Sequence, residues 1–420
     1  MFRQLISLDE AKRRIEKAFS PKPPKTEEIP LLKAVGRVLA SDIAAPMDVP
    51  PFSRSTVDGY AVRAEDTFGA DEDKPVMLKI SGYADVGEIS KLRLEKNYAM
   101  KIVTGAPLPS NSNAAVMIEH TNEENEKVYV YKSVVKNENM MGKGSDIRKD
   151  AMVLKGGTIL SSQNLGVLAA LGFAQVKVYK KPKVAVISTG QEIIAPGNPL
   201  PLGKIYDINA YTLTAALLEI GVEPINFDII QDDNVEVLKS TLENALDISE
   251  VVITSGGVSV GPKDILPNII DGLGEPGLII HGIAIKPGKP IAVAVVGEKL
   301  IFSLPGHPTS ALLTYQLLIR PFLPLLTKQK ALPSTTLRAV ITDKVFSARG
   351  RRTFITVTLS QNDAGHWLAS PVLEGLSGAI TTLAKADGYI ELEETQQFVE
   401  SGEEVDVLLF KPVEDIGRLS

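Results

Sequence analysis

The chain has 420 residues, too many for one ordinary hydrophobic core, so we expect roughly two to four domains. Its composition, 44% hydrophobic and 23% charged, is typical of a soluble globular protein. The net charge of −6 argues against nucleic-acid binding, because nucleic-acid-binding proteins usually carry a basic face. Neither a membrane-length apolar run nor the apolar region of a signal peptide is apparent, so we expect a cytoplasmic protein without a membrane partner.

Cysteine and histidine usage limits the chemistry of the chain. There is no cysteine, and the four histidines lie far apart in the sequence. Disulfides, thiolate nucleophiles and cysteine metal sites are therefore excluded, and a protein-held zinc or iron site is not expected. Any soft metal handled here must take most of its ligands from another molecule.

The first part of the chain predicts a helix followed by a β-domain. Ser7 to Glu10 fits a capping box before a helix over 11–19. From about residue 51 to 138, short apolar runs alternate with Gly, Pro and Asn, which indicates an all-β domain. Its strands are expected over 76–80, 99–103, 115–119 and 127–131, and a helix over 163–171 and a strand over 175–179 follow.

From about residue 182, strands alternate with helices, which indicates a doubly wound α/β domain. Strands are expected over 184–188, 225–230, 251–254 and 291–296, and helices over 209–220, 235–246, 265–270 and 311–320. Asp232 and Asp233 are positioned to cap the second of these helices. Short strands then predict a second small β-domain, over 337–342, 353–359, 388–391 and 404–410.

The loop 255–261 (SGGVSVG) has the composition of an anion site. It follows a strand of buried type and precedes a helix, an arrangement that aims backbone N–H groups at a phosphate. Its serines add hydroxyl donors, and Asp264 could hold a divalent cation against phosphate oxygens. Taken alone, such a loop is more often only a tight turn.

Two further loops of the same chemistry make a ligand site the better interpretation. They are 286–290 (KPGKP) and 302–310 (FSLPGHPTS). Loops at the carboxyl ends of parallel strands gather at one edge of a sheet, so we expect these three loops to line a single crevice. Lys286 and Lys289 would supply positive charge there, and Ser310 a hydroxyl at the start of a helix.

Short motifs rich in Gly, Pro and charged residues lie along most of the chain, at 53–61 (SRSTVDGYA), 104–109 (TGAPLP), 188–192 (STGQE), 255–261, 286–290 and 304–308 (LPGHP). In order, they resemble the motifs of the MoeA family of molybdopterin molybdenumtransferases, to which the E domains of gephyrin and of plant Cnx proteins are related. The resemblance implies an elongated domain I over 1–50 and 141–181, an inserted β-domain II over 51–140, a MogA-like α/β domain III over 182–328 and a C-terminal β-barrel domain IV over 332–412.

The activity that this resemblance implies is molybdenum insertion. Adenylylated molybdopterin, supplied by an upstream molybdopterin adenylyltransferase, would bind together with molybdate, and Mg²⁺-dependent cleavage of the pyrophosphate link would release AMP and molybdenum cofactor. Because a pterin dithiolene brings its own sulfur ligands, a chain without cysteine can still handle molybdenum. Tungstate stays open as the oxyanion, since its size and charge are nearly those of molybdate.

By the same resemblance, the chain forms a homodimer in which Asp58 and Thr104 serve the partner subunit's site. The implied catalytic residues are Asp58, Thr104, Glu192, Asp232, Asp233, Asp264 and Lys286, with Glu192 and Asp264 as metal ligands. The implied substrate-binding residues are Ser255, Gly256, Gly257, Ser259, Gly261, Pro287, Gly288, Lys289, Pro305, Gly306, Ser310, Arg351 and Ser377. Of these positions, Lys286, Ser310, Arg351 and Ser377 would face the molybdate.

The chain departs from the family pattern in three places, and two other functions stay open. His307 stands where the family usually has asparagine, and Gly282 stands where some members have a lysine. The segment 149–152 (KDAM) is shorter than the family's acidic element, which leaves Asp150 as the candidate for the carboxylate expected there. A molybdopterin adenylyltransferase would share the α/β domain, but the motifs around Asp58 and Thr104 argue against it. A non-catalytic scaffold of the gephyrin type is disfavoured by the retained lysines and carboxylates.

Overall fold

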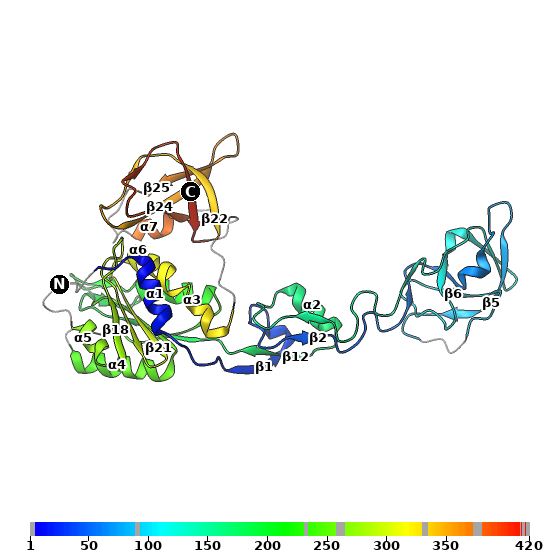
Figure 1. Cartoon of the computed structure of the whole chain (residues 1–420), viewed down its shortest axis with the longest axis horizontal. Coiled ribbons are helices and arrows are strands. Elements are labelled where there is room, and N and C mark those ends of the chain that lie inside the picture. The colour runs from blue at the N-terminus through cyan, green and yellow to red at the C-terminus, as the bar shows by residue number, and fades with distance from the viewer. Residues whose placement is uncertain are drawn as a thin grey trace. The chain divides into compact units, whose positions relative to one another are not determined.

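The computed structural model describes residues 5–88, 93–230, 234–257, 265–329, 335–372, 380–411, 413 and 416. The chain forms two compact units (Figure 1). The first unit comprises Met1–Glu27, Gly36–Val38 and Val178–Ser420, and the second comprises Glu28–Val35 and Leu39–Lys177. The boundary passes within the strands β1 (Thr26–Pro30) and β12 (Gln175–Tyr179). Among the described residues, no helix is long and apolar enough to cross a membrane.

The second unit contains the expected β-domain. Its six-stranded sheet has the order β7-β4-β6-β5-β9-β8, and Tyr60, Leu78 and Val128 belong to its buried core. The strands are β4 (Gly59–Val62), β5 (Val76–Ala84), β6 (Tyr98–Ile102), β7 (Ala114–Met117), β8 (Thr121–Glu124) and β9 (Lys127–Val130). The remaining elements are η1 (Leu31–Lys33), β2 (Ile43–Ala44), β3 (Arg54–Ser55), η2 (Ala64–Thr67), η3 (Ile118–His120), β10 (Met140–Met141), β11 (Met152–Leu154) and α2 (Ser162–Ala170).

The first unit is built around a mixed six-stranded sheet with the order β16-β13-β17-β21-β20-β18. Its strands are β13 (Lys183–Ser188), β16 (Glu223–Asn226), β17 (Val251–Ser255), β18 (Pro276–His281), β20 (Ala292–Val296) and β21 (Lys299–Leu304). The first four strands in the sheet order are parallel, whereas β20 and β18 are antiparallel to their neighbours. The α/β prediction is confirmed, but the sheet is not wholly parallel, because β20 and β21 are joined by a tight turn at Gly297 and Glu298.

Helices cover both faces of this sheet (Figure 1). Val184 and Val186 of β13 face a core shared with helices α1, α3 and α6, whereas Ala185 and Ile187 face a core shared with α4 and α5. These helices are α1 (Leu8–Ala18), α3 (Asn209–Glu219), α4 (Val235–Ile248), α5 (Leu266–Asp271) and α6 (Pro308–Thr314). Because helices cover both faces, the side chains of the central strands are apolar along their length. This explains why these strands appear in the sequence as continuous apolar runs.

Three local predictions in this domain are wrong. The strand expected over 225–230 is β16, which ends at Asn226 because it pairs only with Lys183 to Val186 of β13. The N-cap of α4 is Asn234, whose side chain accepts the N–H of Val237, in place of the expected Asp232 and Asp233, which lie outside the described residues. The helix expected over 311–320 is divided into α6 and the π-helix η4 (Tyr315–Ile319), after which η5 (Leu323–Thr327) follows.

A closed β-barrel follows the α/β domain. Its ring runs β24-β25-β22-β28-β26 and closes through pairing of β26 with β24. The strands are β22 (Thr336–Ile341), β24 (Arg352–Gln361), β25 (Trp367–Pro371), β26 (Gly388–Leu392) and β28 (Glu404–Leu409). The barrel confirms the expected C-terminal β-domain, although the sequence reasoning missed β25, the short pair β23 (Val345–Phe346) and β27 (Phe398–Val399), and α7 (Ile380–Lys385).

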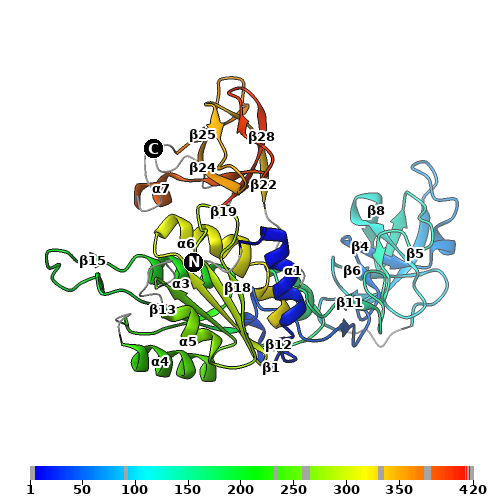
Figure 2. The same cartoon turned by 60° about the vertical axis from the view of Figure 1, so that its left-hand side comes forward.

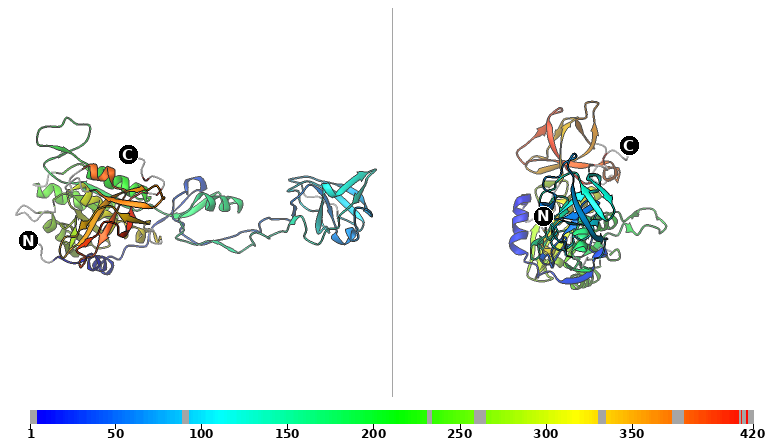
Figure 3. Two further views of the ribbon diagram at one scale, coloured as in Figure 1. Left: turned by 90° about the horizontal axis from the view of Figure 1, so that it is seen from above. Right: turned by 90° about the vertical axis from the view of Figure 1, so that its right-hand side faces the viewer.

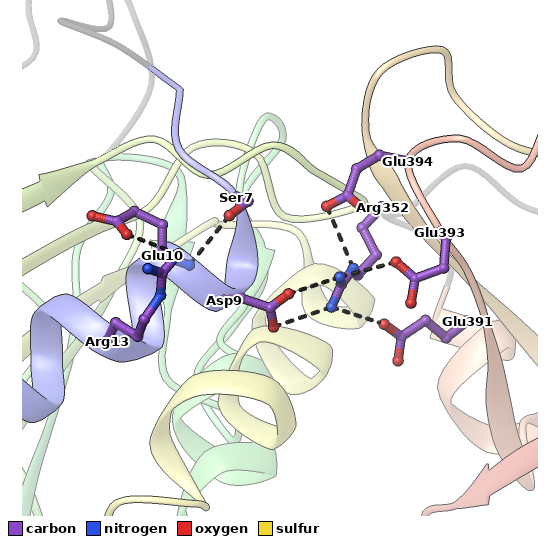
Figure 4. Close-up of polar contacts among 8 residues, drawn as sticks. All are labelled: Ser7, Asp9, Glu10, Arg13, Arg352, Glu391, Glu393 and Glu394. Carbon is purple, nitrogen blue, oxygen red and sulfur yellow. Dashed lines mark hydrogen bonds and ion pairs between the residues drawn. The ribbon is translucent and has the colours of Figure 1, made fainter.

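The barrel is joined to the α/β domain by strand pairing and by an ionic cluster. Strand β19 (Ile285–Lys286) pairs in parallel with the start of β24, and the N–H of Arg352 donates to the carbonyl of Ala284 at 3.0 Å. The Arg352 side chain, only 12% exposed, contacts four carboxylates (Figure 4). Its nitrogens lie 2.9 Å from Asp9, 3.2 Å from Glu391, 2.9 Å from Glu393 and 3.4 Å from Glu394.

This cluster connects the first turn of α1 to the start of β24, to β26 and to the loop after β26. Ser7 caps α1 by accepting the N–H of Glu10, which places Asp9 beside Arg352 (Figure 4). Burial alone would lower the pKa of Arg352, but the hydrogen bond to Asp9 and the charges of Glu391, Glu394 and Asp9 outweigh it and raise that pKa. Burial also disfavours the charged form of Glu391 and raises its pKa, and this effect outweighs the positive charge of Arg352, which would lower that pKa.

Replacing Arg352 should destabilise the first unit strongly. We expect Arg352→Met to lower the free energy of unfolding by about 3 kcal/mol, because it leaves several carboxylates close together without their shared cation. The matched control is Arg338→Met, whose pairs with Glu404 and Asp406 are exposed and should contribute less than about 1 kcal/mol. Urea unfolding of both variants measures the difference, and equal losses would contradict this role for the cluster.

Candidate functional site

The strands β13, β17 and β21 end at the same level of the sheet. Ser188 lies opposite Ser255, and Ser255 lies opposite Leu304, in continuous parallel register. Strand β20 starts at this edge, because Ala292 pairs with Ser303, so the segment after Lys286 arrives there too. The loops that begin at Thr189, Gly256 and Pro305 therefore meet the segment 287–291 at one edge of the sheet.

Glycine is required where these loops approach one another. Gly256 has φ +100°, and a Cβ on it would lie 2.2 Å from the carbonyl oxygen of Thr189. Its N–H donates to the carbonyl of Leu304 at 3.2 Å, which ties the loop after β17 to the loop after β21. Gly288 has φ +104°, and a Cβ there would lie 2.8 Å from the hydroxyl of Thr314 in α6. Any larger residue would push these loops apart.

Of the predicted basic residues, Lys286 lies on strand β19 and Arg351 lies in the turn just before β24. Lys286 is exposed and pairs in register with Thr353, one residue beyond Arg352. The Thr353 hydroxyl accepts the N–H of Ala348 and donates to the carbonyl of Arg351, which holds the turn carrying Arg351. Lys286 and Arg351 thus come from segments that the barrel and the α/β domain position together.

The remaining described residues at this edge differ in exposure. Glu192 is exposed, and its carbonyl accepts the N–H of Ile205. Ser255 and Ser310 are 2% and 3% exposed, and Pro305 is buried as well. The Ser255 hydroxyl accepts a hydrogen bond from Asn209, a residue that the sequence reasoning treated only as the start of a helix. No pattern in the sequence distinguishes Asn209 from an ordinary first helical residue.

Asp58 and Thr104 come together within the second unit. One carboxylate oxygen of Asp58 accepts the backbone N–H of Thr104 at 2.6 Å and its hydroxyl at 2.9 Å. These two bonds, the backbone bond first, lower the pKa of Asp58 although its side chain is exposed. Gly59 beside it has φ +149°, and a Cβ there would meet the carbonyl of Val116 at 2.0 Å. The loop therefore presents an ionised carboxylate in a fixed position.

Several predicted site residues lie outside the described residues. They are Asp232, Asp233, Ser259, Gly261, Asp264 and Ser377. Within the part of the chain that is described, no three Asp, Glu or His side chains gather in a way that could hold a metal ion. Of the two predicted metal ligands, only Glu192 is among the described residues. Its carboxylate lies next to Gly190, at the edge formed by the loops.

Comparison with known proteins covers nearly the whole chain. Residues 6–172 match the MoeA N-terminal region (domains I and II), residues 185–325 the probable molybdopterin binding domain, and residues 338–410 the MoeA C-terminal region (domain IV). The molybdopterin molybdenumtransferase of Bacillus subtilis is 34% identical over 410 residues, which cover 97% of this chain and 94% of that protein. A putative molybdopterin biosynthesis protein of Methanocaldococcus jannaschii is 36% identical over 92% of this chain and 93% of its own length.

The chain belongs to the MoeA family. A crystal structure of the molybdopterin biosynthesis MoeA protein from Pyrococcus horikosii agrees in fold, with a TM-score of 0.87 and 42% identity over 97% of this chain and all of that chain. The resemblance inferred from the motifs and the multidomain fold of α/β and β-barrel type are therefore confirmed. The motif residues Ser255, Lys286 and Gly306 of this MoeA-family chain lie within the part that matches the probable molybdopterin binding domain.

The Asp58 contact predicts a pH-dependent contribution to stability in this MoeA-family chain. A carboxyl whose pKa is lowered by folding stabilises the folded state above its ordinary pKa, and this stabilisation disappears as the pH falls through the folded-state pKa. We expect Asp58→Asn to be less stable than the unmodified protein at pH 7 and to approach it below about pH 4.

Thermal unfolding followed by circular dichroism between these pH values tests the expectation. Thr104→Val is the matched control, since it removes the hydroxyl but keeps the backbone N–H that is the larger cause of the shift. A stability difference between Asp58→Asn and the unmodified protein that stays constant with pH would show that the carboxylate charge is not what Thr104 stabilises.

Proposed function

We propose that this chain is a molybdenum insertase, which combines molybdate with adenylylated molybdopterin, cleaves the pyrophosphate link and releases AMP. The coarser assignment, a molybdopterin molybdenumtransferase of molybdenum cofactor biosynthesis, follows from its membership of the MoeA family and from relatives of that name aligned over nearly the whole chain. The observation that carries the finer proposal is the convergence of anion-type loops at one sheet edge, with Ser255, Lys286 and Gly306 among them.

The chemistry of the loops suits two kinds of anion. Molybdate and phosphate accept hydrogen bonds and offer none at neutral pH, so their site needs donors such as the ammonium of Lys286. Cleavage of a pyrophosphate depends mainly on positioning and on neutralisation of charge. Lys286 is exposed and Lys289 half-buried in the same short segment, which suits contact with a ligand that is itself partly exposed.

Mg²⁺ dependence is part of the proposal. Mg²⁺ is commonly held by one or two carboxylates together with substrate phosphates, and it would neutralise charge on the phosphate oxygens when bound. Glu192, an exposed carboxylate beside Gly190 in the loop that Gly256 approaches, fits that limited role. The second proposed ligand is Asp264, and no protein-only metal centre is required.

The proposed assembly is a homodimer, with an upstream molybdopterin adenylyltransferase as the source of substrate. An arm of the α/β domain, residues 193–206, extends from its body between β14 (Ile193–Ile194) and β15 (Ile205–Tyr206), as Figures 2 and 3 show. Leu200 is 51% exposed, Ile205 is 55% exposed and Leu202 is fully exposed. Apolar side chains this exposed on an extended arm support contact with another chain.

The reaction is tested with adenylylated molybdopterin, Mg²⁺ and either molybdate or tungstate, by measuring AMP and metal-loaded pterin. We expect AMP release that requires an oxyanion and falls about 100-fold or more in Lys286→Met, because a fixed cation at the anion site is lost. Lys239→Met, on the exposed face of α4, is the matched control and should leave the rate unchanged.

Other results would reassign the function. AMP release that is independent of any oxyanion would contradict insertion. Formation of adenylylated pterin from ATP would favour an adenylyltransferase, and tight binding without turnover would favour a carrier or scaffold. The relative rates with molybdate and tungstate rank the two oxyanions.

A shared site predicts complementation between subunits. If Asp58 of one subunit completes the site that contains Lys286 of its partner, then Asp58→Ala and Lys286→Met should each be inactive alone. Mixed in equal amounts and allowed to exchange subunits, they should recover roughly a quarter of the unmodified activity, because half of the dimers would carry one intact site of two. AMP release after mixing measures the recovery.

The matched control carries both substitutions in one chain and is mixed with unmodified protein. In a shared site, its heterodimers have a defect in each site and contribute nothing. Activity that stays absent when the two single variants are mixed, although they demonstrably exchange subunits, would place Asp58 and Lys286 in the same subunit's site or in separate roles.

A further inference from the structure

Asn209, the first residue of α3, joins two of the loops at the candidate site. Its amide nitrogen Nδ2 donates to the hydroxyl oxygen of Ser255 at 2.7 Å and to the carbonyl oxygen of Gly306 at 2.8 Å. Ser255 ends β17, and Gly306 lies in the loop after β21, so one side chain spans the two loops. Asn209 is 6% exposed, which makes these bonds buried ones.

The chemistry of the partners determines which way this amide faces. The carbonyl of Gly306 can only accept, so Nδ2 must be the atom that faces it. Nδ2 carries two hydrogens, and the second is directed to Ser255. The hydroxyl of Ser255 therefore acts as an acceptor toward Asn209, and its own hydrogen is left to point elsewhere. No other hydrogen bond of this hydroxyl occurs among the described residues.

A Ser255 hydroxyl that accepts from the protein and keeps its own hydrogen free to donate is what an anion site needs. An anion such as phosphate or molybdate can only accept hydrogen bonds, so a serine serves it only when its hydrogen is not already given to the protein. Asn209, by donating to the oxygen, keeps the Ser255 hydrogen available. An aspartate of the same shape would do the reverse, because its carboxylate would accept that hydrogen and lose the bond to Gly306.

Buried polar atoms without partners gather at the same edge. Among the described residues they include Oδ1 of Asn209, the hydroxyl of Ser188 at the end of β13 and the hydroxyl of Thr309 in α6. Each such atom costs about 1–3 kcal/mol, so folded proteins keep few of them. Three of them around the loops of one edge indicate a polar network kept for ligand contact and not for stability.

We propose that Asn209 is a positioning residue of the substrate site, which orients the Ser255 hydroxyl as a donor to an anionic group of the substrate and holds the Gly306 loop beside it. This inference rests on the proposed function, since it assumes that the edge binds a phosphate or oxyanion. It adds a residue to the site and assigns its action through Ser255, without direct contact between Asn209 and the reacting atoms.

The test is a double-mutant cycle on AMP binding, measured by isothermal titration calorimetry with the full-length protein and Mg²⁺. We expect Asn209→Asp and Ser255→Ala each to weaken AMP binding roughly tenfold, the size of one lost hydrogen bond to a charged group. If Asn209 acts through Ser255, the double variant should bind no more weakly than Asn209→Asp alone. Multiplied losses would overturn the proposal, because Asn209→Asp would then act by its charge alone.

Two further variants separate positioning from folding. Thr214→Val removes a hydrogen bond from the same helix, to Asn226, and should leave AMP binding unchanged. Asn209→Ala leaves a small cavity but adds no charge and takes no hydrogen from Ser255, so it should bind AMP better than Asn209→Asp even where it lowers the melting temperature more. The reverse order of affinities, following the order of melting temperatures, would indicate a purely structural role.

The proposed function and this inference fail in different ways. Protein that binds AMP but shows no oxyanion-dependent turnover would contradict the insertase, while the binding cycle would still decide the role of Asn209. Turnover with a normal rate and normal AMP affinity in Asn209→Asp would overturn the inference and leave the insertase standing. No binding of AMP by the unmodified protein would count against both.

Discussion

The parallel pairing of β13, β17 and β21 is the constraint on which the candidate site depends. Their register places Ser188, Ser255 and Leu304 side by side, and the buried residues on both faces prevent the strands from slipping. The loops beyond these residues can then approach closely only because Gly256 carries no side chain. A site made of backbone N–H groups and short hydroxyls is thus positioned by the apolar core beneath it.

The cationic part of the site depends on a second interaction, between the barrel and the α/β domain. Lys286 belongs to a strand that pairs with β24, and Arg352 at the start of β24 is held by carboxylates from α1 and from the barrel. Phe354 and Tyr389 of the barrel also belong to the same apolar cluster as Leu8 of α1. The position of Lys286 therefore depends on the N-terminal helix, although the two are far apart in the sequence.

Much of this architecture could be predicted because it follows from local patterns. Buried strands such as β13 and β17 are continuous apolar runs in the sequence. Ser7, followed by Glu10 three residues later, predicts the start of α1. The errors occur where tertiary contacts decide. β16 pairs with only part of β13, and the π-helix after α6 begins at Tyr315, a buried member of the main core. The direction of β20 is set by the tight turn at Gly297, which the sequence reasoning did not recognise.

The candidate site divides in the same way. Glycines and lysines in short loops are visible in the sequence, because only certain residue types allow close backbone approach or supply fixed charge. Asn209 and Arg352 are not visible, since each acts through residues that only the fold brings near: Ser255 and Gly306 for the first, Asp9 and Glu391 for the second. Sequence motifs indicate the groups that would contact a ligand. The side chains that orient those groups have no recognisable sequence pattern.

If the sheet edge binds an anion as we propose, a protein with a net charge of −6 must attract that anion by oriented donors more than by its overall charge. Fixed donors can do this because a hydroxyl or an N–H held in place costs no reorganisation when the ligand arrives. Such donors must also be prevented from bonding to the protein itself. Asn209 meets that requirement for Ser255 by donating to the hydroxyl oxygen. The hydroxyls of Ser188 and Thr309, which have no partner among the described residues, are expected at an edge that binds a ligand as we propose. The stability lost at this edge is offset by the packed faces of the sheet, where the central strands bury apolar side chains on both sides.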